Sequence, residues 1–315
     1  MKNEWITGEV PFKYMLSDLT LFKRNIALKI LRFNIISESS PPESIPFPDV
    51  KLVGKEKGYL MRSIPLPSIQ PVYRVEDGYI YYVADQFSRY YIDLQQTFEE
   101  YTAKFSSKTR STIRRKIKKF TAKCNGSMNW RSYRTVDELA EFYRAAREVS
   151  SKSYQEKLLD SGLPDTEQFQ KTIANLAKDD RVRGYLLFDG DKPVAYMYCP
   201  VQDEVLLYQY LGYDPEYIKW SVGTILHWCA FEDILAEKKF RYFDFTEGQS
   251  EHKRLYSTGS LLCGNVYIFP KSIRAWLLVQ SHNAVNVLSK TLGNLLERVN
   301  LKSKIIKIVR FGSNK

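Results

Sequence analysis

Four titratable side chains lie close together near residue 250, where they could carry acid–base chemistry. Residues 241–245 predict a short buried strand, and Asp244, Glu247, His252 and Lys253 come at its end and in the polar turn beyond it. Because the ordinary pKa of histidine is near neutrality, His252 is the first candidate for a general base or acid. Glu247 is the second candidate base. Asp244 would orient a base, hold an amine or simply cap the next helix.

The residues around this cluster have both catalytic and ordinary interpretations. Lys253 would neutralise a phosphate or a developing oxyanion, and Tyr256 would either protonate a leaving thiolate or pack as a buried aromatic. His252 itself could be a solvated residue of a short helix. We expect the other two histidines, His227 and His282, in the core or at the surface.

A glycine-containing turn at 220–224 precedes a helix predicted over 223–238. The N–H groups at a helix N-terminus carry partial positive charge, which suits a pyrophosphate. Ser221 is expected to cap this helix, and Gly223 would let a ligand approach the backbone closely. A capped helix without a ligand is the alternative. The predicted donor-binding turn consists of Ser221, Val222, Gly223 and Thr224.

The strand predicted over 205–212 leads into this turn. A backbone N–H that faces away from the neighbouring strand could stabilise an oxyanion, and such a donor is typically worth about 3–4 kcal/mol of barrier. The expected position is among Tyr210, Leu211 and Gly212.

Hydrophobic periodicity predicts the elements that would hold these residues in place. Residues 1–126 form an N-terminal portion with a helix over 16–31, a Ser/Pro-rich linker over 36–48, short strands and a helical segment over 94–121. The short strands are expected at 51–54, 58–63, 71–75 and 78–83. Residues 127–270 predict, in order, a strand (128–135), two helices (136–148, 167–178), three strands (183–188, 193–200, 205–212), a helix (223–238), a strand (241–245), a short helix (250–257) and a strand (261–269).

Positive charge is concentrated in two places along the 315 residues, whose formal net charge is +11. Residues 103–123 hold nine Lys/Arg and no acid, and 271–315 hold nine Lys/Arg with one glutamate. The first segment predicts a basic helix over 108–119, with Arg114 among the residues that would contact phosphates. Nucleic acid is a weaker alternative there, because aromatic residues for base stacking are missing. The second segment predicts a basic amphipathic tail that docks on its own domain, a membrane surface or a partner.

Composition excludes several classes of protein. No apolar run of membrane-spanning length is present, and the acidic N-terminus does not resemble a secretory signal. The four cysteines are far apart, which indicates reduced buried thiols rather than a disulfide or metal site. We therefore expect a cytoplasmic protein without a bound metal.

The element order over 128–269 resembles the GNAT acyltransferase fold, and three segments resemble its CelD-type and FemAB-like branch. The first is Ser-Ser-Lys-Thr-Arg-Ser-Thr-Ile-Arg-Arg-Lys-Ile-Lys-Lys (106–119), which is similar to the basic helix of that branch. The second joins the turn at 212–217 to 220–224. The third, 243–253, is similar to the pattern Asp-Phe-Gly-x-Gly-x-x-x-Tyr-Lys but has Thr246 and His252 where the pattern has Gly and Tyr.

The resemblance implies an α/β fold with a GNAT-like mixed central sheet flanked by helices. It also implies a smaller, divergent N-terminal lobe, for which a degenerate GNAT lobe is one interpretation, and a helical tail over 271–315. The implied activity is N-acyl transfer from acyl-CoA or acyl carrier protein to an amino sugar, an amino acid or another envelope-linked amine, with no permanently bound cofactor. Two alternatives stay open: a FemAB-like ligase that uses aminoacyl-tRNA, and a non-catalytic subunit of a polysaccharide assembly system.

Overall fold

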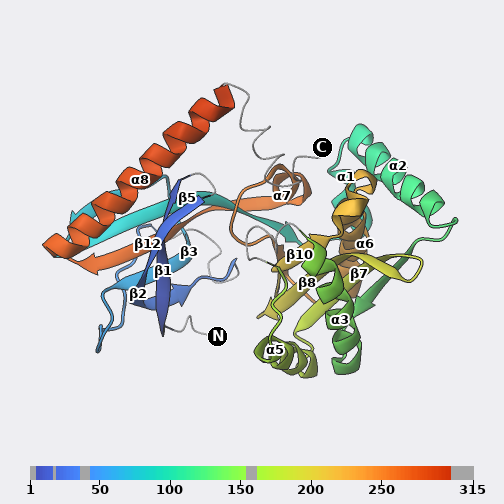
Figure 1. Ribbon diagram of the computed structural model, residues 1–315, viewed down its shortest axis with the longest axis horizontal. Helices are drawn as coiled ribbons and strands as arrows, with labels where there is room; N and C mark the ends of the chain where they lie inside the picture. Colours follow the sequence, from blue (N-terminus) through green and yellow to red (C-terminus); the bar gives the residue numbers. More distant parts are fainter. Residues whose placement is uncertain (1–4, 17–18, 36–42, 154–161, 299–315) are drawn as a thin grey trace. The chain divides into compact units, whose positions relative to one another are not determined.

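The computed structural model describes residues 5–16, 19–35, 43–153 and 162–298, and these residues form two compact units (Figure 1). One unit holds the described residues up to Arg89, residues 247–249 and those from Ser260 onward. The other unit holds Tyr90–Thr246 and Ser250–Gly259. We call them the N-terminal unit and the GNAT-like unit. This division cuts across the segments predicted from the sequence, because the tail helix belongs with the N-terminal unit and the basic helix with the GNAT-like unit.

The GNAT-like unit is built around a mixed sheet in the order β5-β11-β9-β8-β7-β6. Neighbouring strands are antiparallel except for β11 and β9, which are parallel. Strand β5 (Tyr79–Asp93) contributes its last residues to this sheet. The remaining elements are α1 (Phe98–Ala103), α2 (Ser107–Lys123), β6 (Asn129–Tyr133), α3 (Val136–Lys152), α5 (Glu167–Lys178), β7 (Val182–Asp189), β8 (Lys192–Gln202), β9 (Val205–Leu207), β10 (Tyr210–Tyr213), the 3₁₀ helix η2 (Pro215–Trp220), α6 (Val222–Glu237), β11 (Tyr242–Asp244) and α7 (Glu251–Tyr256).

Helices cover both faces of this sheet, which explains why β7 and β8 are apolar almost throughout. Tyr185 and Leu187 of β7 pack in the core that contains α1, α2 and α6. Leu186, between them, packs in the core that contains α3 and α5. Helix α6 is buried on nearly every side, so its sequence shows no polar face. The mixed sheet flanked by helices confirms the predicted fold class.

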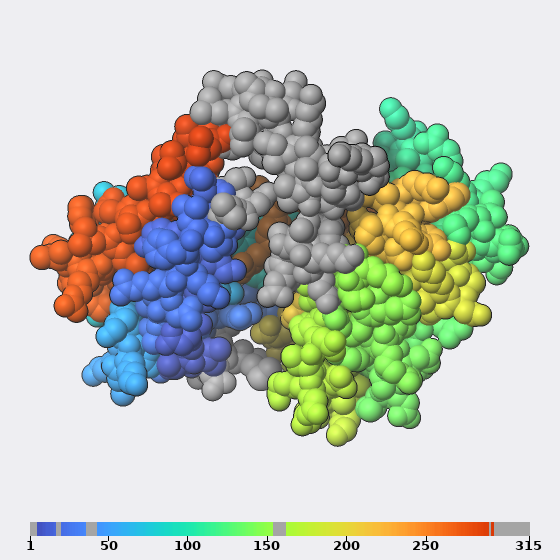
Figure 2. Space-filling view, in the orientation of Figure 1, coloured from blue at the N-terminus to red at the C-terminus, as the bar shows by residue number. Residues whose placement is uncertain are grey.

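The N-terminal unit contains a second group of strands and one long helix. The strand order is β1-β2-β3-β12-β5, with β4 paired to β5. The elements are β1 (Ile6–Leu16), β2 (Leu19–Arg32), β3 (Tyr59–Pro65), β4 (Tyr73–Glu76), β12 (Gly259–Pro270) and α8 (Ile273–Arg298). Helix α8 lies against β1, and the space-filling view shows its surface beside the blue β1–β2 hairpin (Figure 2). None of the helices in the described ranges is long and apolar enough to cross a membrane.

Two predictions for the N-terminal portion are wrong. The helix expected over 16–31 is part of an antiparallel hairpin, in which Val10 of β1 is opposite Ile26 of β2. Its buried residues alternate along each strand, as Ile26, Leu28 and Ile30 do on β2, and this two-residue period is typical of a half-buried strand. Residues 51–54, predicted as a strand, form none. The tail segment 305–310 lies outside the described residues.

Candidate active site

A cavity of about 500 Å³ lies in the GNAT-like unit, with walls from α2, the first turn of α6 and α7. Three residues predicted for the site line it: Thr224, His252 and Tyr256. The α2 wall contributes Lys108, Thr109, Thr112, Ile113 and Lys116, and α7 also contributes Glu251 and Leu255. The lining therefore combines two cations, the carboxylate of Glu251, several hydroxyl groups, an imidazole and two aliphatic side chains.

Helix α2 is placed by its buried residues, and that placement decides which cations face the cavity. Ile113 and Phe120 are buried in the core. Lys108, Ile113 and Lys116 all line the cavity, and the two lysines share a helix face because they are eight residues, two steps of four, apart. Neither lysine forms an ion pair with any described residue. Arg114, the residue predicted from the sequence, is exposed and does not line the cavity.

Arg110 is held away from the cavity by backbone carbonyls. Its guanidinium donates to the carbonyl oxygen of Phe105 at 2.7 Å and to that of Ala103 at 3.4 Å. These bonds tie the start of α2 to the end of α1, so Arg110 has a structural contact that the charge pattern did not reveal.

The start of α6 differs from the expected capped turn. Ser221 is the N-cap residue, but its backbone is left-handed (φ 57°) and its side chain makes no capping hydrogen bond, so the predicted side-chain cap is wrong. Val222 is buried in the core. A Cβ on Gly223 would meet Tyr213 of β10 at 3.6 Å, so this glycine faces β10. Thr224 is the residue of this turn that lines the cavity.

The predicted strand over 205–212 is interrupted, as expected for a strand that parts from its neighbour. Leu206 is opposite Val201 of β8, and Tyr210 is opposite Tyr198 of β8. The chain thus advances four residues from β9 to β10 while β8 advances three, so the register with β8 shifts by one residue. Before this bulge β9 pairs with β11; after it, β10 continues along β8. The N–H of Tyr208, at the break, donates to the carbonyl oxygen of Asp244 at 2.8 Å.

The residues proposed for the oxyanion position follow this bulge on β10. Tyr210 is partly buried, and its ring packs on Tyr198 and Phe169. A Cβ on Gly212 would overlap the ring of Tyr196, so a glycine is required there for packing. Leu211 is also partly buried and packs against the core of α6. None of the three lines the cavity.

His252 lies on α7 at the cavity wall. Its Nδ1 is 3.0 Å from the hydroxyl of Ser250, the N-cap residue of α7. The ring centroid is 5.7 Å from that of His227 and 6.3 Å from that of Tyr208. Burial and the neighbouring Lys253 ammonium lower the pKa of His252 from its ordinary value. The imidazole is therefore neutral at pH 7 and able to accept a proton.

His227 is buried on α6 behind His252, as a core residue. Burial, with a contribution from His252, lowers the pKa of His227 to about 3, and its ring hydrogen-bonds the backbone of Gly223. Its Nε2 has no hydrogen-bond partner among the described residues. Two neutral imidazoles thus lie next to each other, with Tyr208 packed on both rings and Tyr256 on that of His227.

Tyr256 is the buried end of α7 and joins three elements. Its hydroxyl hydrogen-bonds the Thr224 side chain, and its carbonyl oxygen accepts from the hydroxyl of Tyr101 at 2.8 Å. Burial raises the pKa of Tyr256 to about 12, so the phenol keeps its proton at neutral pH. It is both a packed aromatic and a protonated group at the cavity wall.

The other predicted acids and bases are elsewhere. Asp244 is fully buried at the end of β11, where its Oδ1 accepts from the N–H of Thr246 at 2.8 Å. Lys253 donates to the carbonyl oxygen of Phe245 at 2.7 Å. Glu247 belongs to the N-terminal unit, where its Oε1 accepts from the Ser63 hydroxyl at 2.8 Å.

Sequence reasoning missed Lys108, Lys116, Tyr208 and the place of His227 beside His252. The four-residue spacing of Lys108, Thr112 and Lys116 was a usable signal, because it puts them on one helix face. Nothing in the sequence indicated that the rings of His227 and His252 meet, because that contact depends on how α6 and α7 pack.

Residues 107–254 match the family model of the acetyltransferase (GNAT) domain. The match covers a little under half of the chain, and it agrees with the GNAT resemblance of the same segment. A search of curated proteins found no match.

The solved structures to which this chain is similar include three named proteins. The C-terminal domain of a putative lysylphosphatidylglycerol synthetase from Agrobacterium fabrum has 9% identity and a TM-score of 0.45; the match covers 64% of this chain and 65%, just under two thirds, of that chain. L-PGS from Bacillus licheniformis has 14% identity and a TM-score of 0.44, over 74% and 73%. FemX has 10% identity and a TM-score of 0.46, over 71% and 74%. Likenesses this distant assign no substrate.

Proposed function

We propose that this chain is an N-acyltransferase that moves an acyl group from acyl-CoA, or from acyl carrier protein, to an amine. The observation that carries the proposal is the cavity in the GNAT domain, in which two lysines, the first turn of α6 and the His252–Tyr256 pair share one space. The acceptor class that we favour is an amino sugar or amino acid of envelope or polysaccharide synthesis.

The donor would lie along α2 with its phosphates toward the lysines. Lys108 and Lys116 supply positive charge, and the N-terminal turn of α6 at Thr224 adds backbone dipoles of the same sign. Ile113 and Leu255 offer aliphatic surface for the less polar part of the donor. Arg114, exposed on the same helix, would contribute only to the general attraction of an anion.

The chemical step would be direct attack by the amine. Neutral His252 takes a proton from the substrate ammonium; with its Nδ1 at the Ser250 hydroxyl, Nε2 is the nitrogen left for that transfer. The amine nitrogen then bonds to the thioester carbonyl carbon, and the carbonyl oxygen takes up the negative charge of the tetrahedral intermediate. As the C–S bond breaks, the electron pair stays on sulfur and the Tyr256 phenol gives its proton to that thiolate. The surplus proton that the nitrogen loses on becoming an amide restores the phenol. Asp244 and Lys253 hold the backbone around the base.

Thermal denaturation of the full chain with coenzyme A, with tRNA and with neither tests the donor class. We expect coenzyme A to raise the melting temperature, and a Lys116→Met variant to lose most of that rise. Lys118→Met is the matched control, because Lys118 is exposed on the same helix and does not line the cavity. A rise with tRNA alone would favour the aminoacyl-tRNA-dependent ligase, and a rise with neither would favour the non-catalytic subunit.

A further inference from the structure

We propose that the N-terminal unit contains a second ligand site, which binds an anionic amphiphile: a phosphate head group on a hydrocarbon chain. The site is a cavity of about 810 Å³ between the β1–β2 hairpin, the segment 55–57 and the beginning of α8. Its volume is within the range of about 300–1,000 Å³ that is typical of small-molecule pockets. The proposal goes beyond acyl transfer and does not depend on it.

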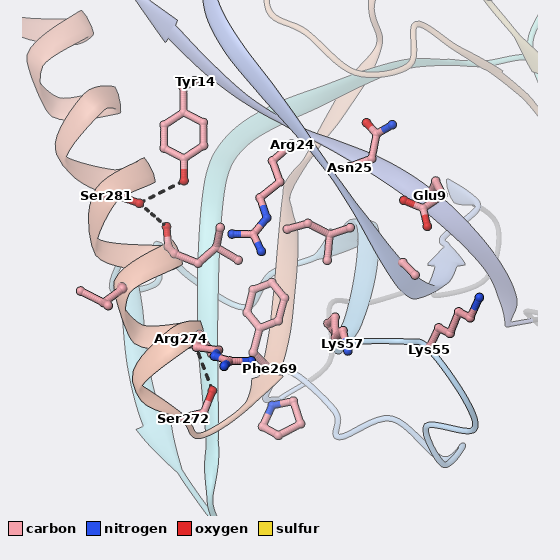
Figure 3. A pocket seen from close by; sticks show the side chains of 16 residues that line it. Glu9, Tyr14, Arg24, Asn25, Lys55, Lys57, Phe269, Ser272, Arg274 and Ser281 are labelled. Atoms are coloured by element: carbon pink, nitrogen blue, oxygen red, sulfur yellow. Dashed lines mark hydrogen bonds between the residues drawn. The ribbon is translucent and has the colours of Figure 1, made fainter.

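Four cations line this cavity against a single acid, Glu9. They come from three different parts of the chain: Arg24 from β2, Lys55 and Lys57 from the segment before β3, and Arg274 from the first turn of α8. Figure 3 shows Arg24, Arg274 and Lys57 around the ring of Phe269. Convergence of separate elements makes this a built site rather than a local run of charge.

These four side chains are exposed to solvent. None of them forms an ion pair with another residue in the described part of the chain. Lys29, further along β2, shows the contrast, because it is 3.6 Å from the carboxylate of Glu56. Cations around one cavity favour an anionic ligand, and two arginines match the geometry of a phosphate group especially well.

Lys57 is held at the rim by its backbone. The N–H of Lys57 donates to the carbonyl oxygen of Ala27 at 2.8 Å, and the N–H of Lys29 donates to that of Gly58 at 3.0 Å. These bonds fix the segment before β3 along β2. The rim is therefore in place before any ligand binds.

Beside the polar side chains of Asn25, Ser272 and Ser281, the lining has an apolar part that extends to the surface. Phe269 is buried at the base of the cavity, with Ile26 and Leu278 nearby. On the opposite wall Tyr14 hydrogen-bonds Ser281 of α8 at 3.0 Å (Figure 3) and stacks on Phe22 at 4.1 Å between ring centroids.

This apolar wall decides between a purely polar anion and an amphiphile. Leu277 lines the cavity and is 54% exposed; Phe22 is outside the lining, stacked on Tyr14, and is 55% exposed. An inorganic phosphate or a sugar phosphate would leave this surface in water. A hydrocarbon chain would cover it, with a gain of about 0.8 kcal/mol for each buried methylene group.

Calorimetric titration of the full chain with monomeric dihexanoylphosphatidic acid, below its critical micelle concentration, tests the site. We expect saturable binding of one molecule per chain. Dihexanoylphosphatidylcholine and inorganic phosphate should each bind at least about tenfold more weakly, because the first lacks the net negative charge and the second lacks the chain.

Matched variants locate the ligand. Arg24→Glu and Arg274→Glu should each weaken binding of the phosphatidic acid at least about tenfold. Lys23, one residue earlier on β2, does not line the cavity. Lys23→Glu makes the same charge change and should alter the dissociation constant by no more than about twofold. Leu277→Asn should weaken binding of the phosphatidic acid but not binding of inorganic phosphate. Ile273 is exposed on α8 outside the lining, so Ile273→Asn should change the binding of neither ligand.

Three outcomes would overturn the proposal. Equal binding of the choline lipid would show that the cations are not used. Equal binding of inorganic phosphate would show that the apolar wall is not used. Binding to vesicles of phosphatidic acid but not to the monomeric lipid would assign the cations to a membrane-facing surface instead of a cavity. Circular dichroism spectra that match the wild type ensure that each variant is folded.

Discussion

Replacing Lys108 and Lys116 of α2 by methionine, singly and together, tests whether α2 binds the phosphates of the donor. Eight residues of helix separate the two lysines, which corresponds to about 12 Å along the axis, so they would meet different phosphate groups. A hydrogen bond to a charged group contributes about 1.5–3 kcal/mol. Because Lys108 is exposed and Lys116 only half-buried, solvent screening favours the lower end, about 1.4 kcal/mol or tenfold in affinity.

Isothermal titration with coenzyme A at fixed ionic strength measures this effect. Each single variant should raise the dissociation constant about tenfold, and the double variant about a hundredfold, since sites more than about 10 Å apart are usually additive. Lys118→Met makes the same change of charge on the exposed side of α2, and its dissociation constant for coenzyme A should stay within about twofold of the wild-type value. Equal weakening by Lys118→Met, or none by the double variant, would refute the assignment of the cavity to the donor.

The other predictions concern the base, the packing of β10 and the buried histidine. His252→Gln should lower kcat at least about tenfold and keep the melting temperature of the wild type. Because the pKa of His252 is lowered, the acid limb of the wild-type kcat/KM profile should lie below pH 6.5. In Lys253→Met, which lacks the neighbouring ammonium, that limb should move to higher pH. Unchanged turnover in His252→Gln would discard its catalytic role. Gly212→Ala should lower the free energy of unfolding by about 1–3 kcal/mol, because the new methyl group overlaps the tyrosine ring opposite it on β8, whereas Gly223→Ala, whose Cβ has room, should not; equal denaturation midpoints would contradict this. His227 has a pKa of about 3 when folded and about 6.5 when unfolded, so the unfolded state binds more protons between these values and stability falls as the pH drops below 6.5; the loss at pH 5 is about 2 kcal/mol. Urea denaturation at pH 7.5 and pH 5 should show a smaller fall in His227→Gln, and an equal fall in both proteins would show that His227 is not the group responsible.

The GNAT-like unit was largely predictable because each of its elements has a clear period or a clear boundary. The capping box of α3, Thr135 with Glu138, marks the start of that helix. The turn between β7 and β8 has its glycine, Gly190, in the left-handed region, as the sequence there indicates. The β1–β2 hairpin was missed because residues 16–31 contain enough leucine and isoleucine to satisfy a helical period as well as a strand period. Pairing with a distant strand decides between them, and a single sequence does not show that pairing.

The candidate site was predicted in part, for a physical reason. His252, Tyr256 and Thr224 are near one another because α6 and α7 begin after consecutive strands, and that order is visible in the sequence. Which cations of α2 face the cavity depends instead on how Ile113 and Phe120 pack, so the charge pattern alone pointed to Arg114. Ser221 was expected to cap α6 with its side chain, but its backbone is left-handed because it also ends η2, the preceding 3₁₀ helix. Nothing in the residue spacing indicated that 3₁₀ helix.

Hydrogen–deuterium exchange of the full chain with and without saturating coenzyme A tests the central claim most directly. Donor binding in the cavity predicts slower exchange at 108–116, at the first turn of α6 and at 251–256, and little change along α3 and α5. Protection that misses these three segments, or no protection at all under conditions where coenzyme A binds, would contradict the assignment of this cavity to acyl transfer.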